Sequence, residues 1–297
     1  MNIIGHRKIF LSISGILVLA AVVSVLTFGF KPGIDFVGGT MWQIRLATSD
    51  KIQATSEIKD FFGKNLGVQN ATVFPSDNQS FIIRLDNISE TEHQQYLSAL
   101  QEKFGSIEEI RFEGIGPSIG KELRKRAFQA IALVLLGISL YIAFAFRKVS
   151  YPIKSWKYGL ITLITLFHDI AIPAGLLAFL GWRWGIEVDV NFVVALLVIM
   201  GFSVHDTIVV FDRIRENLLL KHQRFDLENI INDSVNSTIA RSINTSFTLV
   251  LVLLSLFFLG PITLKYFILT ILVGTVIGTY SSIFVASPLL LLWASKK

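Results

Sequence analysis

Long uninterrupted runs of apolar residues alternate with short polar segments along this chain. A helix needs roughly 20 apolar residues to cross the hydrocarbon core of a bilayer. Arg7 and Lys8 precede the first run as in a signal peptide, but the run is long for one and no convincing cleavage site follows, so we predict a retained anchor. Six runs are long enough to span, and they predict membrane helices near 9–30, 127–146, 157–181, 190–211, 242–260 and 266–293.

The segment between the first two runs has the shorter periodicities of a soluble domain. Apolar and polar residues alternate over 81–85, as in a half-buried strand, and Ser89 with Glu92 forms a capping box at the start of a helix. The order β-α-β-β-α-β predicts a split βαβ, ferredoxin-like unit. Its predicted strands are 40–47, 71–75, 81–85 and 109–113, and its helices are 49–65 and 89–104.

The predicted fold class is therefore a six-span α-helical membrane protein with one α+β ferredoxin-like exported domain between helices 1 and 2. We expect three parts, which are the N-terminus with the first span (1–30), an extracytoplasmic domain (31–122) and a bundle of five further spans (123–297).

Composition agrees with a membrane protein. Hydrophobic residues make up 52% of the chain and charged residues 16%, against about 25% in soluble domains. The net charge of +5 does not indicate a nucleic-acid partner, because the basic residues cluster beside the apolar runs, next to membrane lipids. The chain has no cysteine, which excludes disulfides and thiolate-bound metals.

The distribution of Lys and Arg in the short loops predicts the orientation. With the N-terminus in the cytoplasm, the two short outer loops hold only Arg183 and Lys265. Both termini are then cytoplasmic and 31–122 is extracytoplasmic. The cytoplasmic face holds thirteen basic residues, Arg7, Lys8, Arg147, Lys148, Lys154, Lys157, Arg213, Arg215, Lys221, Arg224, Arg241, Lys296 and Lys297.

Ionisable residues inside the predicted spans are candidates for function. A charged group at the bilayer midplane costs about 3 kcal/mol on insertion scales. On the fourth span, Asp206 shares a helical face with Ser203 and Arg213 and therefore points toward one neighbour, for which Arg241 at the start of the fifth span is the best candidate. A carboxylate beside a fixed cation is either a proton carrier or a structural ion pair, and both interpretations stay open.

The third span carries a second polar group. Pro173 lies four residues after Asp169, so the carbonyl of Asp169 loses its usual amide donor. His168 and Asp169 either extend a hydrated proton path or bond across the bundle at a helix kink. Adjacent residues on a helix point about 100° apart, so we expect neither His168 with Asp169 nor His205 with Asp206 to converge as an enzyme site. No metal-ligand spacing is present, and no cofactor is predicted.

Small residues recur at four-residue spacing along the sixth span. This spacing permits close helix approach and favours packing, with a sliding surface between two bundles as the alternative. The residues are Gly274, Gly278, Ser282 and Ala286.

Four segments together resemble the SecD/SecF family of protein-export membrane proteins, relatives of the resistance-nodulation-division (RND) transporters. The resemblance covers the whole chain, and DTIVVFDRIREN is its most specific part. The glycines of the first two segments favour a hinge and a helix start, because neither segment ends as a phosphate-binding loop does. The segments are GIDFVGGT (33–40), GPSIGKEL (116–123), GFSVHDTIVVFDRIREN (201–217) and ARSINTSFTLV (240–250).

The resemblance implies roles for individual residues. Asp206 corresponds to the family's essential membrane aspartate and Arg241 to its basic partner. Apart from the resemblance, the polar residues His205, His168, Asp169 and Thr245 of the spans are candidates for relay support. His205 departs from the Asn that commonly precedes the aspartate. The resemblance further implies that Asp35, Gly38 and Gly39 couple the span to the exported domain, and that Asp212 and Arg213 pair at the cytoplasmic boundary.

The implied function is that of a subunit of the SecDF accessory complex in the bacterial cytoplasmic (inner) membrane. Such a subunit uses the proton motive force to assist Sec-dependent translocation and is not an enzyme. The implied partners are SecD, the SecYEG translocon, the translocating polypeptide, protons and membrane lipids. The alternatives are an RND-type proton-coupled exporter of lipids or small molecules, an intramembrane enzyme and a non-energised scaffold, which would tolerate Asn at Asp206.

Overall fold

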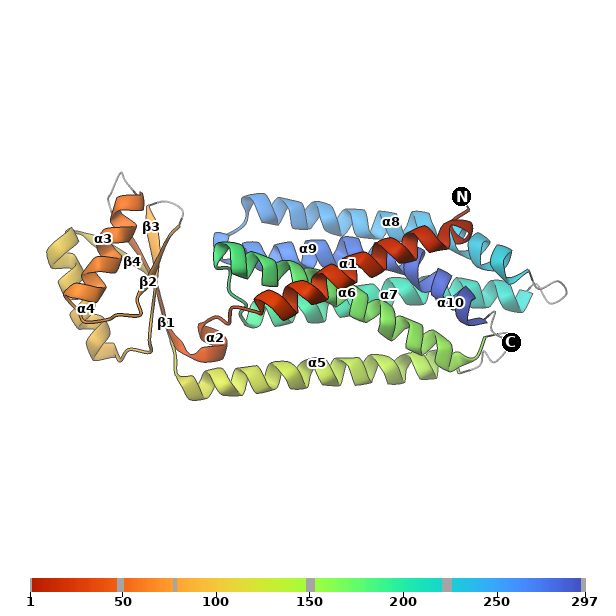
Figure 1. Ribbon diagram of the computed structural model, residues 1–297, viewed down its shortest axis with the longest axis horizontal. Helices are drawn as coiled ribbons and strands as arrows, with labels where there is room; N and C mark the ends of the chain where they lie inside the picture. Colours follow the sequence, from red (N-terminus) through yellow and green to blue (C-terminus); the bar gives the residue numbers. More distant parts are fainter. Residues whose placement is uncertain (1, 47–50, 77–78, 148–152, 221–225, 295–297) are drawn as a thin grey trace. The chain divides into compact units, whose positions relative to one another are not determined.

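The computed structural model of the chain describes residues 2–46, 51–76, 79–147, 153–220 and 226–294. It divides into two compact units (Figure 1). The membrane unit comprises Met1–Lys31 and Gln129–Lys297, and the sheet unit comprises Pro32–Phe128. The second boundary falls inside helix α5 (Pro117–Ala145).

Within the described ranges, six helical segments are long and apolar enough to cross a membrane, as the apolar runs predict. The last of them is a continuous series of α9, a π-helical turn η3 and α10, preceded by the short turn η2 (Ile262–Leu264). The helices are α1 (Arg7–Phe28) after the turn η1 (Ile4–His6), α5, α6 (Ser155–Trp184), α7 (Val190–Leu220), α8 (Leu227–Leu259), α9 (Lys265–Ser281), η3 (Ser282–Ala286) and α10 (Ser287–Ala294).

Helix α8 begins well before the predicted start of its span at 242. Its first turns are polar on one side but bury Ile230, Ile231 and Val235, so they pack on the bundle outside the apolar run. The side chain of Asp226 caps this helix by accepting a hydrogen bond from the backbone N–H of Asn229. Hydropathy alone marks the membrane-crossing part of such a helix and misses its amphipathic extension.

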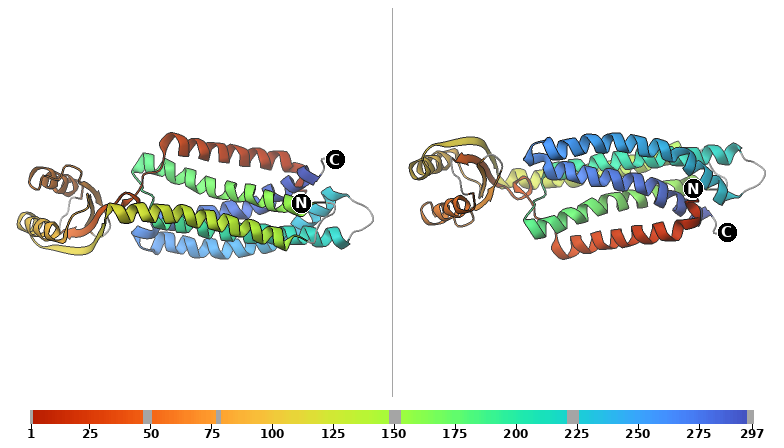
Figure 2. Two further views of the ribbon diagram at one scale, coloured as in Figure 1. Left: turned by 90° about the horizontal axis from the view of Figure 1, so that it is seen from below. Right: turned by 90° about the horizontal axis from the view of Figure 1, so that it is seen from above.

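The bundle is held together at one end by contacts between helix ends. The backbone N–H of Ile3 donates to Asn232 Oδ1 at 2.9 Å, close to the start of α8. Lys157 Nζ, at the start of α6, donates to the carbonyl of Trp293 at 2.6 Å in α10. The start of the first span therefore contacts the start of the fifth, and the start of the third contacts the end of the sixth. These four ends lie at the same end of the bundle, as expected when successive spans alternate in direction (Figure 2).

Helix α9 occupies the centre of the membrane unit, where it packs against α6, α7 and α8 (Figures 1 and 2). The small residues of the sixth span make this possible. A Cβ atom on Gly274 would lie 2.3 Å from Ile199 Cδ1, and Gly278, Ser282 and Ala286 are all buried. This supports the packing interpretation of that spacing.

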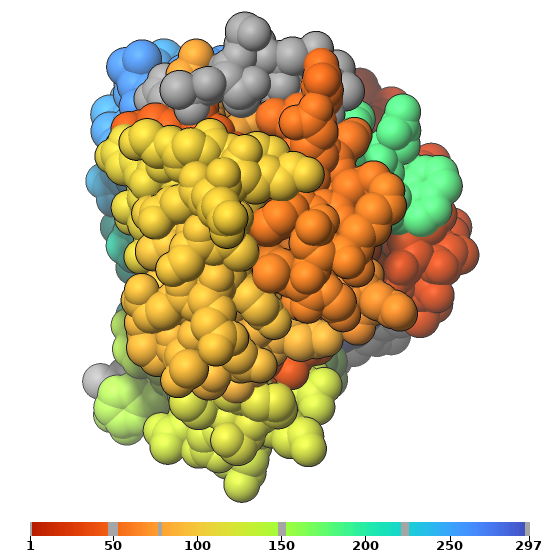
Figure 3. Space-filling view, turned by 90° about the vertical axis from the view of Figure 1, so that its left-hand side faces the viewer, coloured from red at the N-terminus to blue at the C-terminus, as the bar shows by residue number. Residues whose placement is uncertain are grey.

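The sheet unit has the predicted β-α-β-β-α-β order. Its antiparallel sheet runs β2-β3-β1-β4, which is the split βαβ arrangement of a ferredoxin-like fold. The two helices lie side by side on one face of the sheet, where Phe62 and Tyr96 meet edge to face (Figures 1 and 3). The elements are β1 (Gly39–Leu46), α3 (Lys51–Lys64), β2 (Thr72–Pro75), β3 (Ser80–Leu85), α4 (Glu90–Phe104) and β4 (Ile107–Ile115).

The core of the sheet unit follows from the alternation of the strands. Trp42, Ile44, Phe81 and Ile83 point from the two central strands to the helix-covered face and are fully buried. The capping box of Ser89 and Glu92 is confirmed at the start of α4. The predicted strand end at 47 and helix start at 49 lie outside the described residues. A four-residue helix that the sequence did not predict, α2 (Ile34–Val37), precedes β1.

Candidate functional site

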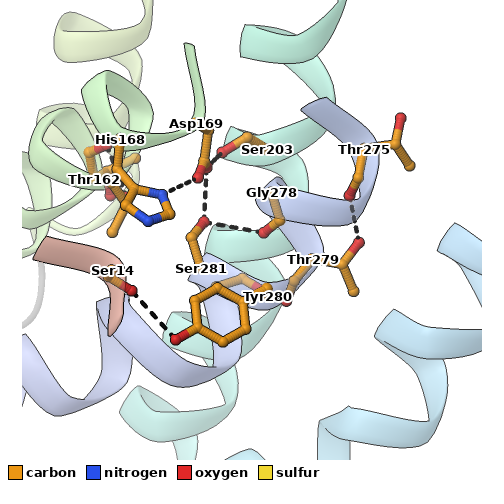
Figure 4. A network of polar contacts seen from close by, with 12 residues as sticks. Ser14, Thr162, His168, Asp169, Ser203, Thr275, Gly278, Thr279, Tyr280 and Ser281 are labelled. Atoms are coloured by element: carbon orange, nitrogen blue, oxygen red, sulfur yellow. Dashed lines mark hydrogen bonds and ion pairs between the residues drawn. The ribbon is translucent and has the colours of Figure 1, made fainter. Parts of the chain in front are cut away.

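Asp169 lies at the middle of α6 and is completely buried. Its carboxylate accepts hydrogen bonds from Ser281 Oγ at 2.7 Å and from the hydroxyl of Ser203, and His168 Nδ1 lies 2.7 Å from Asp169 Oδ1 (Figure 4). These partners come from α6, α7 and α9. A buried carboxylate needs such donors, because each unpaired polar group in a dry environment costs free energy.

The contact between His168 and Asp169 corrects the expectation that adjacent helical residues diverge. Adjacent residues start about 100° apart on the helix, but here the two side chains turn toward each other and meet, with Asp169 also held by Ser281 of α9. The ring of His168 lies near that of Tyr280, with centroids 6.4 Å apart. Its other nitrogen, Nε2, is buried without a hydrogen-bond partner in the described part of the chain.

Tyr280 connects this group to the first span. Its hydroxyl donates to the carbonyl of Phe10 at 3.1 Å, and Ser14 Oγ donates to that hydroxyl at 3.3 Å (Figure 4). The polar group around Asp169 therefore receives side chains from α1, α6, α7 and α9.

Asp206 is the second buried carboxylate, with 6% of its surface exposed. It lies on α7, on the same face as Ser203 and one turn further along. Ser242 Oγ, on α8, donates to Asp206 Oδ1 at 2.6 Å, and the hydroxyl of Ser282, at the start of η3, donates to Oδ2. Both carboxylate oxygens are thus held by neutral hydroxyl groups.

The two carboxylates are held by adjacent residues of the sixth span. Ser281 bonds Asp169 and Ser282 bonds Asp206. Gly278, one turn earlier, makes room for this arrangement, because a Cβ atom there would lie 3.3 Å from Ser203 Cβ and 3.8 Å from Asp169 Oδ2. The two groups therefore form one buried polar site at mid-span, which we call the two-carboxylate site (Asp169, Ser203, Asp206, Ser242, Ser281 and Ser282).

In the described part of the chain no ion pair joins Arg241 to Asp206, so the predicted partner of Asp206 is wrong. The reason is helical geometry: Ser242 takes the inward position on α8, and its neighbour Arg241 points about 100° away and is exposed. Thr245 on α8 and His205 on α7 are exposed as well. The structure brings together Asp206 and Asp169 from the predicted relay residues, and it leaves Arg241, Thr245 and His205 on the outside of the bundle.

The predicted pair of Asp212 and Arg213 is also wrong. Arg213 bonds Glu216 at 2.6 Å, and Asp212 bonds Arg215 at 3.1 Å. Partners three residues apart share a face of the helix, whereas adjacent residues do not. Asp212 and Glu216 are exposed and the two arginines are partly exposed near the end of α7.

Asp35, Gly38 and Gly39 lie in the sheet unit, away from the buried carboxylates in sequence and element. Asp35 is in the first turn of α2 and is half-buried, and the two glycines join α2 to β1. Their coupling role stays a prediction.

The hydroxyl donors are the part of the site that sequence reasoning missed. Neither Ser242, which lies in the ARSINTSFTLV segment, nor Ser282, which belongs to the small-residue spacing of the sixth span, is predicted from the sequence to bond a carboxylate. The available signal was a pair of adjacent serines, Ser281 and Ser282, in the middle of an apolar run. In the part of the chain that the structure describes, no three His, Cys, Asp or Glu side chains are grouped to hold a metal ion.

Six helices long enough to cross a membrane, two carboxylates buried at mid-span and one small α+β unit define a polytopic membrane protein with an ionisable site inside its helical bundle. Two family models match the chain. The family described as "Protein export membrane protein SecD/SecF, C-terminal" matches residues 95–296, and the "SecD/SecF GG Motif" matches residues 23–49. The chain therefore belongs to the SecD/SecF family of protein-export membrane proteins and is a multi-pass membrane protein.

Individual relatives agree with this assignment. The chain is 42% identical to "Protein translocase subunit SecF" of Thermobaculum terrenum, over 100% of this chain and 95% of the relative. It is 36% identical to "Protein translocase subunit SecDF" of Thermus thermophilus, over 95% of this chain and 37% of the relative.

A solved structure shares the fold. The crystal structure of SecDF, a translocon-associated membrane protein from Thermus thermophilus, superposes with a TM-score of 0.85 at 32% identity. The match covers 100% of this chain and 39% of the SecDF chain. This chain thus corresponds to well under half of that longer protein.

Proposed function

We propose that the chain is a subunit of a protein-export machine in which proton binding at Asp206 moves the membrane helices. The observation that carries this proposal is the pair of serine hydroxyls, from Ser242 and Ser282, on a carboxylate buried at mid-span. A hydroxyl donates to an ionised carboxylate and accepts from a protonated one, so the site can satisfy both forms by rotating two O–H bonds. A fixed Arg partner offers only donors and favours the ionised form alone.

The relatives support the export role. Two of them are named as translocase subunits, SecF and SecDF, and the longer SecDF chains contain a region equivalent to this chain together with additional sequence. We infer that this chain works with SecD, which supplies the remaining half, and with the SecYEG channel and its translocating polypeptide. The chain acts as a moving part and not as an enzyme.

The outward face of α8 supports a second helical half as the partner. Arg241, Asn244, Thr245 and Thr248 follow one another at helical spacing and are exposed within a span. A charged side chain facing lipid costs about 3 kcal/mol, so a face of this kind requires protein or water against it. SecD, a second six-span half, is the occupant that the fused SecDF relatives favour.

The orientation proposed from the loop charges puts both termini in the cytoplasm and 31–122 outside the bacterial inner membrane. Protons then enter from the outside and neutralise Asp206, which weakens its hydrogen bonds to α8 and η3. The resulting repacking is passed through the first span and the segment of Asp35, Gly38 and Gly39 to the exported domain, which grips or releases the polypeptide. One charge crossing 100 mV supplies about 2.3 kcal/mol, enough to shift a two-state equilibrium by about 50-fold.

The test is an export assay in membranes with an imposed proton gradient, using Asp206→Asn. The matched control is Asp212→Asn, an exposed acid on the same helix. We expect Asp206→Asn to assemble with SecD and to lose the proton-dependent part of export, and Asp212→Asn to retain it. Normal proton-dependent export by Asp206→Asn would reject the proposal, and loss of assembly would indicate a structural role instead.

A second variant tests the partner face. Arg241→Met removes the charge that α8 exposes and leaves the Ser242–Asp206 bond in place. We expect weaker co-purification of SecD or loss of proton-dependent export. Thr270→Ala, a buried hydroxyl that bonds only its own helix, serves as the control. Unchanged assembly and export of Arg241→Met would show that this face has neither role.

A further inference from the structure

We propose that Ser281 and Ser282 are positioning residues that couple Asp169 to Asp206, so that the two carboxylates bind protons as one unit. This deepens the proposed function, on which it rests, by adding a second proton-binding carboxylate and the element that connects it to the first. Asp169 is the more deeply buried of the two and has more hydrogen-bond partners.

Each of the two serines has two acceptors within reach but only one proton. Ser281 Oγ lies 2.7 Å from Asp169 Oδ2 and 3.1 Å from the carbonyl of Gly278 (Figure 4). Ser282 Oγ likewise reaches Asp206 Oδ2 and, at 3.0 Å, the carbonyl of Thr279. An ionised carboxylate is the stronger acceptor and holds the hydroxyl proton.

Proton uptake changes this choice. When the carboxylate becomes a carboxylic acid it is neutral and accepts more weakly, so the serine proton turns to the backbone carbonyl of its own helix. Each serine thereby has two positions: in one it donates to the carboxylate on α6 or α7, and in the other it donates to its own helix and only accepts from the carboxylic acid. The proton itself ends on a carboxylate oxygen, and no other bond forms or breaks.

The turn that carries the serines is suited to transmit this change. Ser282 begins the π-helical segment η3, and Ser287 Oγ donates to the carbonyl of Ser282 at 3.3 Å. π-Helical turns are wider and less regular than α-helical ones and recur at functional sites. One peptide bond joins Ser281 to Ser282, so a backbone shift at either residue moves the other.

The titratable groups around the two carboxylates come from several helices. Asp169 is faced by His168 from its own helix, by Tyr280 beside His168 from α9 and by Ser203 from α7, with Asp206 one turn further along. Asp206 is faced by the hydroxyls of Ser242 and Ser282. Within the described residues, no Lys or Arg forms an ion pair with either carboxylate.

The experiment is an infrared titration of the full chain in lipid vesicles, which detects the C=O stretch that appears when a buried carboxylate takes up a proton. Asp169→Asn and Asp206→Asn each remove one band and so assign both. Coupled sites interact by more than about one pK unit. We therefore expect Asp206→Asn to move the midpoint of the Asp169 band by about one pH unit.

The serine variants then test the connection. In the Ser281→Ala chain, we expect the Asp169 band to titrate at the same pH with and without Asp206→Asn. Ser281→Thr keeps a hydroxyl and should restore the dependence on Asp206. Thr270→Ala, a buried hydroxyl on α9 that donates at 2.7 Å to the carbonyl of Tyr266, should leave both bands unchanged.

Two results would overturn the proposal: an Asp169 midpoint that ignores Asp206→Asn in the otherwise unchanged chain, or coupling that survives in Ser281→Ala. If Ser281→Ala does not fold, the midpoint of the Asp169 band with and without Asp206→Asn still tests whether the two carboxylates are coupled. The readout needs no translocase, so its failure is distinct from failure of the proposed function. If proton-dependent export requires Asp206 but the two carboxylates titrate independently, only this inference is rejected. If the carboxylates are coupled but export does not require Asp206, only the proposed function is rejected.

Discussion

The backbone of Gly120 lies directly against that of Gly38: a Cβ atom on Gly120 would be 3.0 Å from the Gly38 nitrogen. A Cβ atom on Gly38 would in turn be 2.9 Å from Pro117 Cα. The two glycine-rich segments, 33–40 and 116–123, are distant in sequence but contact each other in the sheet unit. This contact fixes the end of α2 against the first turn of α5, beside the pairing of Gly39, at the start of β1, with Ile115, at the end of β4.

Gly38→Ala should disrupt this contact. Gly38 has a φ of +85° and a ψ of 169°, a region essentially restricted to glycine, where an L side chain costs roughly 1–3 kcal/mol, and the added methyl group would meet backbone atoms that cannot rotate away. We expect a destabilisation of about 1–3 kcal/mol, including the overpacking. Hydrogen exchange of the strand amides in the full chain measures it.

The matched control is Gly63→Ala, in the helix α3. A Cβ atom there meets nothing within 4 Å, and alanine is the better helix former by about 0.5–1 kcal/mol. Strand protection should therefore be equal to or better than that of the unchanged chain. Equal exchange in Gly38→Ala and Gly63→Ala would contradict the role of the glycine contact.

The packing of α1 on α6 depends on Gly175. A Cβ atom on Gly175 would lie 2.5 Å from Ala21 Cα, and Ser24 Oγ donates to the Gly175 carbonyl at 2.8 Å. Small residues allow this close approach of two membrane helices. We expect Gly175→Ala to separate α1 from α6 and to destabilise the bundle by about 1–3 kcal/mol, measured by unfolding in mixed micelles.

Gly137→Ala on α5 is the control for this prediction, because a Cβ atom there has no neighbour within 4 Å. It should unfold at the same denaturant fraction as the unchanged chain or at a slightly higher one, because alanine is the better helix former. A Gly175→Ala variant that behaves like this control would mean that α1 is not held at the position of Ala21.

Glu109 is the acceptor at the centre of a polar group in the sheet unit. Its Oε2 accepts from Trp42 Nε1 at 2.8 Å and lies 2.6 Å from His93 Nε2. Trp42 and His93 are buried, and His93 stacks on Phe112 with ring centroids 3.7 Å apart. Both contacts fall on the same oxygen, so Glu109→Gln can keep an acceptor there but removes its charge, and exchanging charged for neutral hydrogen bonds should cost about 1–2 kcal/mol.

Thermal unfolding of the sheet unit within the full chain, followed by the near-ultraviolet signal of its aromatic residues, measures this loss. The neighbouring Glu108 supplies the control, because its ion pair with Arg45, at 2.6 Å, is largely exposed. Exposed pairs contribute roughly 0.2–1 kcal/mol, so Glu108→Gln should change little. Similar losses in the two variants would contradict the buried role of Glu109.

The sequence predicts the parts of this protein that depend on period and length. Runs of apolar residues located the six spans, and alternation at Phe81, Ile83 and Leu85 located a sheet strand, because burial selects residues at the period of the element. The same reasoning identified Asp206 and Asp169 as buried acids, because charges are otherwise excluded from spans.

The partners of those acids were not predictable from the sequence in this way. Opposite charges favour Arg241 as the partner of Asp206. Adjacent residues on α8 point about 100° apart, however, and it is Ser242 that faces and reaches Asp206. The same rotation separates Asp212 from Arg213. The π-helical turn that begins at Ser282 changes the helical register locally, and no periodic pattern in the sequence marks it.

The capping box of α4 makes a prediction about pH. Glu92 accepts hydrogen bonds from the backbone N–H of Ser89, at 2.7 Å, and from its hydroxyl, at 2.8 Å, and these bonds hold the pKa of Glu92 below its ordinary value of 4.5. The folded state therefore binds this proton less tightly than the unfolded chain. The stabilisation is present above pH 4.5 and is lost as the pH falls through the lowered folded-state pKa. Because Glu92 is fully exposed, solvent screens the effect and we expect it to be small.

Glu92→Gln lacks this titration. We expect the difference in unfolding free energy between the unchanged chain and Glu92→Gln to be largest near neutral pH and to decrease below pH 4.5, as followed by hydrogen exchange of the α4 amides. Other carboxylates titrate in the same range, among them Asp60 and Glu90, whose pKa values are also lowered by hydrogen bonds, but they are common to both chains and cancel in the difference. Glu102→Gln, on the last turns of α4 and outside the capping box, supplies the comparison. A difference between the unchanged chain and Glu92→Gln that stays constant from pH 7 to pH 3 would mean that the cap acts through the shape of the side chain and not through its charge.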